Sequence, residues 1–459
     1  MAKPPGPRYP AIVQTLFYLA RPEQYLTALH RRYGDVFTLS TVIFGPEVCV
    51  VRPEQIKKVF TGDPDRLRAG EANVALEPLV GRKSVLLLDG AEHLRQRRLM
   101  MPPFRGERML AYAKTMREIT DRAIDAWSPG KSFAVHPEMQ QITLEIILRT
   151  IFGADEGAEL DALREAITAV LEKVNSRFTM LGTLPALRRN LWGLSPWAGF
   201  QRVTKKADEL IFRQIARRRK DEQTARTDVL SLLLAARDEE GNPMSDVELR
   251  DELMTLLAAG HETTATELAW MFERVLREPK VVQRLEDEIA RARSAGGALD
   301  FERMPYVDAT IKEVLRVRPV IPAVGRRVKE AMVVDGYDVP AGHLLVPGVW
   351  LTHRLPDLYP DPDAFRPERF LDVKTDPYAW LPFGGGIRRC VGMAFALFEM
   401  KVVFATVLSR MSVRLAHPDP ARVVLRGFTH APEKGVPIIV EKRREAVIAP
   451  AADRARAAV

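Results

Sequence analysis

One cysteine near the C-terminus stands among residues whose types could support metal chemistry. The segment reads PFGGGIRRCVG from Pro382 to Gly392, and Cys390 is one of only two cysteines in a chain of 459 residues. Glycines permit unusual backbone angles and close approach, so consecutive N–H groups can turn toward a sulfur. Such donors, with the cation of Arg388, suit a metal-bound thiolate, whereas a cysteine without such neighbours is more often a buried, inert thiol.

The rest of the sequence restricts which metal Cys390 could bind. Zinc is disfavoured at Cys390, because no second cysteine and no nearby histidine could complete four protein ligands. What remains is a metal whose other ligands belong to a cofactor, and heme fits best. The other cysteine, Cys49, lies in a predicted strand and is interpreted as a small core residue.

A second group of polar residues interrupts a long predicted helix. Residues 245–248 (SDVE) form a capping box, and the helical pattern continues to Pro279, over about 33 residues or about 50 Å. In its middle, residues 258–266 (AAGHETTAT) place a glycine, an acid and three threonines where a core helix would have leucines. We expect a local opening of the helix there. Glu262 and Thr263 are either solvent-facing helix residues or an acid and an alcohol that deliver protons to dioxygen during its reduction.

The two groups together resemble motifs of the cytochrome P450 superfamily. The string Phe383-x-x-Gly386-x-Arg388-x-Cys390-x-Gly392 is similar to the heme-thiolate loop of that family, and residues 259–264 (AGHETT) are similar to its oxygen-activating stretch. The resemblance implies heme b with the Cys390 thiolate as axial ligand of the iron. Further heme contacts would come from the same loop and from the long helix, at Phe383, Gly384, Arg388, Gly392 and Ala259.

Two more motifs of the family occur in the expected order. Residues 313–316 (EVLR) resemble its ExxR helix, and residues 365–370 (FRPERF) resemble the segment whose arginine joins that helix. The resemblance implies a buried network of Glu313, Arg316 and Arg369 with a structural role, since breaking it would strand a buried charge. The flanking pattern also agrees with the family over nearly the whole chain.

The resemblance also indicates which cations face the heme propionates. His93 and Arg97 lie four residues apart on a predicted helix, at the place where family members hold these carboxylates. Arg326 or Arg327 is a further candidate. The alternative for His93 and Arg97 is an ordinary position on the helix surface.

The reaction that the resemblance implies is monooxygenation. One oxygen atom of O2 enters a C–H bond, as in hydroxylation, and the other leaves as water. A peroxide-dependent or rearranging heme-thiolate enzyme and a non-catalytic heme sensor are the alternatives, although the former commonly lacks the acid–threonine pair. Because the sequence shows no flavin, NADPH or iron–sulfur module, electrons are expected from a ferredoxin or flavodoxin with its reductase.

The substrate is expected to be a lipophilic small molecule, such as a fatty acid, terpenoid, steroid or polyketide. This expectation depends on the apolar character of the segments that the resemblance places around the substrate. The residues concerned are Leu76, Leu86, Phe178, Ala258, Val320, Ile321, Val324, Phe428 and Thr429.

Strand patterns near both ends of the chain enclose a helical middle. Residues 35–51 alternate about Gly45-Pro46 as a hairpin, residues 331–350 carry the Asp335-Gly336 pair of a tight turn, and apolar spacings of three and four dominate residues 110–325. We expect a mainly α fold with small β-sheets (α+β). Residues 1–442 would form a single domain with the heme between the long central helix and the cysteine loop, followed by a disordered tail over 443–459.

Composition restricts the setting and the partners. The formal charge is +8, but most arginines are interleaved with acids, so a solvated surface is more plausible than a nucleic-acid site. The basic run at residues 95–108 and Arg388-Arg389 would attract an acidic protein if they shared one face. No apolar run reaches the roughly 20 residues of a membrane anchor, and two distant cysteines favour the reducing cytoplasm. A monomer is expected.

Overall fold

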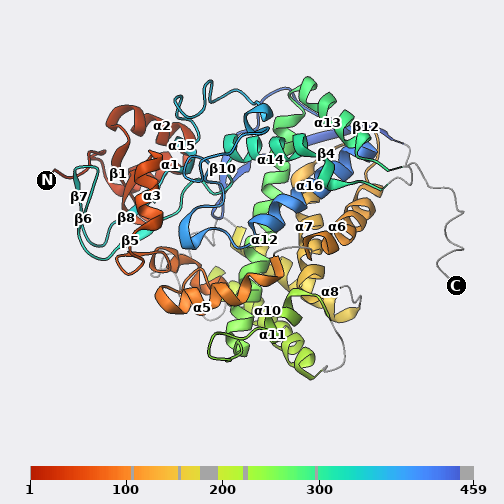
Figure 1. Ribbon diagram of the computed structural model, residues 1–459, viewed down its shortest axis with the longest axis horizontal. Coiled ribbons are helices and arrows are strands. Elements are labelled where there is room, and N and C mark those ends of the chain that lie inside the picture. The colour runs from red at the N-terminus through yellow and green to blue at the C-terminus, as the bar shows by residue number, and fades with distance from the viewer. Residues whose placement is uncertain are drawn as a thin grey trace, which may run out of the picture.

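The long helix α12, Asp246–Val275, crosses the centre of the computed structural model (Figure 1). The predicted capping box is present: the Ser245 hydroxyl accepts from the backbone N–H of Glu248, and the Glu248 carboxylate accepts from the N–H of Ser245. The helix has 30 residues and ends before Pro279, because proline disfavours helical geometry in the residue that precedes it. The structure describes residues 2–104, 108–153, 157–175, 195–220, 226–294 and 298–444.

The predicted opening in the middle of α12 is not seen. The helix runs without interruption through residues 258–266. Gly260 instead faces the neighbouring helix α7, Val135–Phe152, where an added Cβ would lie 3.3 Å from Cδ1 of Ile147. The glycine therefore permits close packing of two helices, which the sequence pattern alone does not distinguish from a local opening.

Helices account for most of the middle of the chain, as predicted, and surround α12 (Figure 1). Apolar residues from α6, α7, α8, α10, α12, α14 and α16 form one continuous core. The other helices are α1 Ala11–Ala20, α2 Pro22–Tyr33, α3 Pro53–Thr61, α4 Glu77–Val80, α5 Gly90–Met100, α6 Arg108–Asp125, α8 Ala158–Asn175, α10 Pro196–Lys220, α11 Val229–Ala235, α13 Pro279–Arg291, α14 Pro305–Val317, α15 Val349–Thr352 and α16 Met393–Arg410.

Strands from both ends of the chain pair with one another. A five-stranded sheet has the order β1-β2-β8-β5-β3, in which β2 and β8 are parallel and the other neighbours antiparallel. The order β4-β12-β9 forms a second sheet, and β6-β7 and β10-β11 form two hairpins. The strands are β1 Val36–Thr41, β2 Gly45–Val50, β3 Leu67–Arg68, β4 Ser132–Ala134, β5 Arg326–Val328, β6 Met332–Val334, β7 Tyr337–Val339, β8 Leu344–Pro347, β9 Met411–Leu415, β10 Val423–Arg426, β11 Thr429–Pro432 and β12 Pro437–Arg443.

Both predicted hairpins are confirmed, with one shift of position. Asp335 and Gly336 form the turn between β6 and β7, and both have positive φ. The turn of the first hairpin lies at residues 42–44, so Gly45 and Pro46 belong to β2 and not to the turn. The predicted mainly α fold with small sheets is thus confirmed.

The first two residues of the predicted tail, Arg443 and Arg444, make contacts with the fold. Arg443 ends β12 and donates hydrogen bonds to the carbonyls of Asp125 and Trp127, and Arg444 pairs with Glu286. Residues 445–459 lie outside the described residues. Within the part of the chain that the structure describes, none of the helices combines the length and the hydropathy that a membrane span requires.

Candidate functional site

The cysteine loop depends on its glycines for its shape. Gly384 and Gly386 have φ of +66° and +63°, and the Cys390 N–H donates to the Phe383 carbonyl over 2.9 Å. An added Cβ on Gly385 would lie 2.5 Å from the ring of Phe60, and one on Gly386 would lie 2.2 Å from the Phe60 carbonyl oxygen. Helix α3, which carries Phe60, therefore packs directly against this loop, and only glycine fits at these positions.

Cys390 is an exposed residue, although many protein atoms lie around its thiol. Burial is the largest effect on the pKa of this thiol and raises it, while the N–H of Gly392 and the cations of Arg97 and Arg389 lower it. These groups would stabilise a thiolate once a metal had displaced the proton. Cys49 is 3% exposed in β2, so it is the core residue that was predicted.

Arg388, predicted as a cofactor contact, makes its described polar contacts outside the cysteine loop. Its guanidinium points toward the segment before α5, where it donates to the carbonyls of Val85 and Leu88 and pairs with Asp89 over 2.6 Å. Asp89 in turn accepts from the backbone N–H groups of Ala69 and Gly70. Arg388 therefore ties the cysteine loop to an early segment of the chain.

Several predicted heme contacts do converge on one buried histidine. His93 on α5 is 1% exposed, and its Nδ1 has no hydrogen-bond partner among the described residues. Burial, followed by the nearby cations Arg388, Arg97 and Arg326, lowers the pKa of His93 to about 3. A neutral histidine thus lies within the field of three arginines.

Arg326, not Arg327, is the residue that faces this cluster. Arg326 is 7% exposed with its guanidinium over the Phe60 ring, whereas Arg327 points to the other side of β5 and donates to the Gly342 carbonyl. Burial lowers the pKa of Arg326 and of Arg388 to about 10. Bound carboxylates would stabilise these desolvated cations, so the residues present fit the propionates of heme.

The central helix offers an accessible face near the cysteine loop. Ala259 is exposed, although Leu257 and His261 on either side are buried. One turn earlier, α12 is tied to the same segment that Arg388 holds: Thr255 lies 2.7 Å from Ser84 Oγ, and Glu252 accepts from the N–H of Val85. Helix α12 and the cysteine loop therefore both bond to one segment, residues 84–89.

Glu262 and Thr263 make contacts in different places. The Thr263 hydroxyl donates to the Ala259 carbonyl over 2.6 Å. The buried Glu262 carboxylate accepts from the Gln140 amide over 2.7 Å and lies 3.4 Å from Arg426 Nε and 3.7 Å from His136 Nε2. Sequence reasoning did not connect Gln140, Arg426 or His136 with Glu262, because no motif links residues so far apart.

The predicted charge network is present and buried. Arg316 donates two hydrogen bonds to Glu313, over 2.7 and 2.8 Å, and neither side chain is exposed. Arg369 Nε lies 3.5 Å from the same carboxylate, and Arg316 also donates to the His353 carbonyl. The network therefore holds α14 to the loop that leads toward the cysteine.

The predicted pocket residues fall into three groups. Val320 lies in the main core, and Leu76, Leu86 and Ala258 pack against it partly buried. Val324 packs instead against the core under the five-stranded sheet. Thr429 is buried with its hydroxyl on the Arg426 carbonyl, Ile321 and Phe428 are half-buried, and Phe178 lies outside the described residues.

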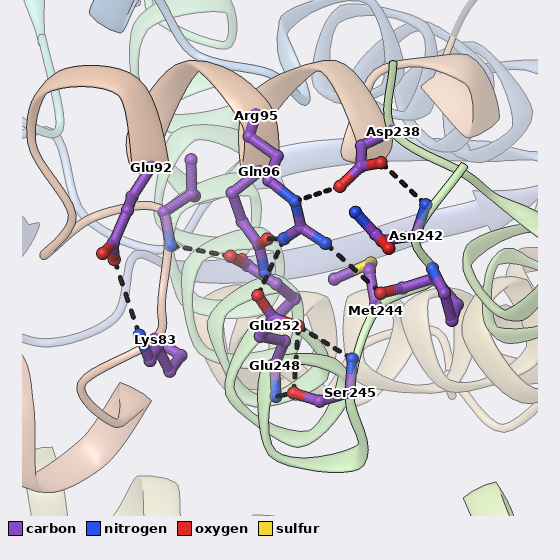
Figure 2. Close-up of polar contacts among 12 residues, drawn as sticks. Lys83, Glu92, Arg95, Gln96, Asp238, Asn242, Met244, Ser245, Glu248 and Glu252 are labelled. Atoms are coloured by element: carbon purple, nitrogen blue, oxygen red, sulfur yellow. Dashed lines mark hydrogen bonds and ion pairs between the residues drawn. The ribbon is translucent and has the colours of Figure 1, made fainter. Parts of the chain in front are cut away.

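The basic face predicted at residues 95–108 is largely neutralised. Figure 2 shows Arg95 between Asp238 and Glu248, at 2.6 and 2.8 Å. Arg98 pairs with Glu239, and the charge of Arg97 lowers the pKa of His93 and opposes the rise in the pKa of Cys390. Arg389, by contrast, has no ion pair among the described residues, so a partner could reach this cation.

Comparisons with known proteins decide the family. The family model "Cytochrome P450" matches residues 4–436. The chain is 42% identical to cytochrome P450 135B1 of Mycobacterium tuberculosis, over 97% of this chain and 93% of that protein. The chain belongs to the cytochrome P450 family. It is also 37% identical to the P450 135A1 of that organism, over 96% of both chains.

Solved P450 structures share the fold. The retinoic acid-bound cyanobacterial CYP120A1 superposes with a TM-score of 0.82 at 23% identity, over 97% of this chain and all of that one. The heme domain of cytochrome P450DA gives 0.83 at 23% identity, over 98% and 99%. As a P450, the protein is an oxidoreductase, a monooxygenase that uses O2 and binds heme iron through a cysteine thiolate.

Proposed function

We propose that Cys390 supplies the thiolate and that the protein inserts one oxygen atom of O2 into a lipophilic small molecule. The observation that carries this proposal is an accessible cysteine, in a loop shaped by three glycines, beside buried cations that converge on His93. Cys49 is buried in a strand and could not reach a cofactor without unfolding β2.

Each predicted site residue has a role in this proposal. His93, Arg97, Arg326 and Arg388 would hold the propionates, and Phe383, Gly384, Gly392 and Ala259 would lie against the ring. Bound heme supplies the activation of O2 that C–H oxidation requires. The Thr263 hydroxyl would orient a proton, and the Glu262 carboxylate would replenish it.

The substrate and partners follow from the same features. The apolar residues from Leu76 to Thr429 named above would contact a fatty acid, terpenoid, steroid or polyketide. Electrons would arrive from a ferredoxin or flavodoxin with its reductase, on the face that Arg389 marks. We place this activity in the cytoplasm and in a monomer. Residues 1–442 would form a single domain, and nucleic acid would not be a partner.

Reconstituted turnover tests the function. The holoprotein, NADH and a surrogate ferredoxin with its reductase would be supplied with compounds that displace water in a spectral titration of a lipophilic library. We expect a product that carries one atom of label from ¹⁸O2. Product formed only with added peroxide, isomerisation without label, or binding without turnover would identify a peroxide-dependent enzyme, a rearranging enzyme or a heme sensor instead.

The thiolate is tested separately. The reduced, carbon monoxide-treated holoprotein should show the absorption of thiolate ligation, and Cys390→Ser should lose it. Cys49→Ser is the matched control and should keep it. Absorption typical of imidazole ligation in the unmodified protein would contradict the assignment of Cys390.

A further inference from the structure

Helix α1 buries polar side chains and exposes apolar ones, the opposite of an ordinary surface helix. Its buried side chains are polar, Gln14 and Thr15, while Ile12, Leu16 and Phe17 are 53%, 59% and 52% exposed. A surface helix normally buries its apolar stripe and exposes its polar one. The helix therefore presents Ile12, Leu16 and Phe17 to the outside of the molecule, while Tyr18 packs against the core beneath.

The polar side of α1 has a structural task. Strand β1 is the edge of the five-stranded sheet. Gln14 Oε1 accepts from the N–H of Ser40 over 2.8 Å, and the Thr15 hydroxyl accepts from the N–H of Val42 over 3.0 Å. These bonds satisfy backbone groups that an edge strand would otherwise leave open. The orientation of α1 is thus fixed, and its apolar side faces outward as a consequence.

The exposed apolar side chains on and beside α1 are here termed the α1 apolar patch. Ile12, Leu16 and Leu19 recur at spacings of four and three on one side of the helix, and Tyr9 and Phe17 are in edge contact beside them. The patch comprises Tyr9, Ile12, Leu16, Phe17, Leu19 and Val42, which are 37–59% exposed. Figure 1 places α1 in the left part of the molecule, on the same side as the N-terminus.

Cations stand at both ends of the patch. Arg8 precedes the helix and Arg21 follows it, and both are exposed with no ion pair among the described residues. Arg422 donates to the carbonyl of Ala20 at the C-terminal end of α1 and is exposed as well. Apolar side chains flanked by free arginines match the two parts of an anionic lipid surface, its acyl boundary and its headgroups.

We propose that the α1 apolar patch binds the surface of an anionic bilayer, with Arg8 and Arg21 on lipid phosphates. A second copy of the chain fits less well, because one ten-residue helix offers far less than the roughly 800 Å² that each partner buries in a stable interface. The arginines would also repel their counterparts in a second copy. In this contact the helix lies at the surface of the bilayer and does not cross it.

Vesicle binding of the holoprotein tests this proposal. We would measure co-sedimentation with phosphatidylcholine vesicles and with vesicles that also contain phosphatidylglycerol. The unmodified protein should bind the anionic vesicles, and high salt should weaken binding. Leu16→Asp should lower the partition coefficient by about tenfold or more, and Arg8→Gln with Arg21→Gln should lower it by about tenfold.

The matched control is Leu110→Asp on α6. Leu110 is also a helical leucine and is 51% exposed, but α6 lies on the opposite side of the molecule in Figure 1. This variant should bind as the unmodified protein does. The heme spectrum and circular dichroism would confirm that each variant is folded.

Three outcomes would overturn the proposal. These are equal binding of Leu16→Asp and the unmodified protein, binding that ignores phosphatidylglycerol, and a dimer in sedimentation analysis that Leu16→Asp dissociates. The last outcome would assign the patch to a second copy. The measurement does not depend on substrate or turnover, so it stands apart from the proposed function.

Discussion

Two neighbouring residues of α12, Glu262 and Thr263, reach different surroundings. The hydroxyl of Thr263 is bonded within the helix, whereas the carboxylate of Glu262 is held by Gln140 and Arg426 from α7 and β10. Because the Arg426 side chain is 38% exposed, the acid lies between the helix and solvent. This arrangement suits a carboxylate that passes protons inward and a hydroxyl that positions them.

Replacing Thr263 with alanine should separate electron use from product formation. Without the hydroxyl, electrons from NADH would leave as hydrogen peroxide, so product per NADH should fall several-fold while NADH consumption continues. Product, NADH and peroxide would be measured together. Thr263→Ser keeps the hydroxyl and should retain most of the coupling, and unchanged coupling in Thr263→Ala would contradict the role.

Replacing Glu262 with glutamine should slow the proton supply without removing the bulk of the side chain. Turnover should fall by about 100-fold, and the ratio of rates in H2O and D2O should change. Gln140→Leu removes one hydrogen bond but leaves the ion pair with Arg426, so its effect should be smaller. Equal loss in both variants would indicate that the site has merely collapsed.

The sequence predicted the functional residues that lie in short motifs, and it missed the residues that contact them from distant parts of the chain. Cys390, Glu313 and Arg316 stand in short local patterns, whereas Gln140 reaches Glu262 across 122 positions. Asp89 was missed for the same reason. The choice between Arg326 and Arg327 needed the strand, because adjacent side chains of β5 point to opposite faces.

Between elements, buried polar contacts hold α14 and the loops around the cysteine. Arg316 donates to three backbone carbonyls besides Glu313, those of His353, Pro362 and Ala364. Arg316 thereby fixes the loops that contain these three carbonyls to α14. Removing either charge would leave the other buried and unpaired.

Glu313→Gln should unfold this region. We expect a loss of about 3–5 kcal/mol in the free energy of unfolding, and purified protein with little heme. Glu368→Gln is the matched control, since Glu368 pairs with Arg284 while both are about half exposed, so it should cost under about 1 kcal/mol. Urea unfolding and heme content would be measured, and normal heme content in Glu313→Gln would contradict the structural role.

His353 connects two loops and predicts a dependence on pH. Its Nε2 accepts from the N–H of Leu381 and its Nδ1 donates to the Arg316 carbonyl, and burial lowers its pKa to about 3. Since the unfolded chain takes up a proton near pH 6.5, this neutral histidine stabilises the fold above that pH and stabilises it progressively less toward pH 3.

His353→Leu tests this dependence. At pH 7.5 the variant should be less stable by about 2 kcal/mol, because two polar groups lose their partners. The difference from the unmodified protein should shrink at pH 5. A difference that stays constant between the two pH values would show that His353 is protonated in the fold.

The elements themselves were largely predictable. The capping box located the start of α12, and turn residues located β6 and β7. The role of Gly260 could not be predicted, because a glycine within a helix can mark either a local opening or close packing. The contact with Ile147 on α7 shows that it is close packing.

For the whole molecule, the distribution of charge differs most from the sequence-based prediction. Arg95 is an internal tie between α5 and the start of α12, as Figure 2 shows, and not part of a docking face. A run of cations in a sequence does not reveal which acids will fold against it. Asp238 lies 143 positions from Arg95.

Arg389→Glu and Arg95→Met should therefore have different effects. Arg389→Glu should raise the KM for a ferredoxin several-fold, more at low salt than at high salt. Arg95→Met should leave that KM unchanged and lower stability by about 1 kcal/mol. Steady-state kinetics at two ionic strengths and urea unfolding would be measured. A change in KM that occurs only in Arg95→Met would show that Arg95, and not Arg389, contacts the ferredoxin.

The loop that carries Cys390 is closed by residues made long before it. Arg388 bonds to Val85, Leu88 and Asp89, about 300 positions earlier, and Phe60 fills the space beside Gly385. While the ribosome is still adding the first three quarters of the protein, His93, Arg97 and Arg326 exist but Arg388 and Cys390 do not. With Cys390 as the proposed ligand, heme would be held only after residue 390 has been translated, and a polypeptide that ended before it would lack the thiolate.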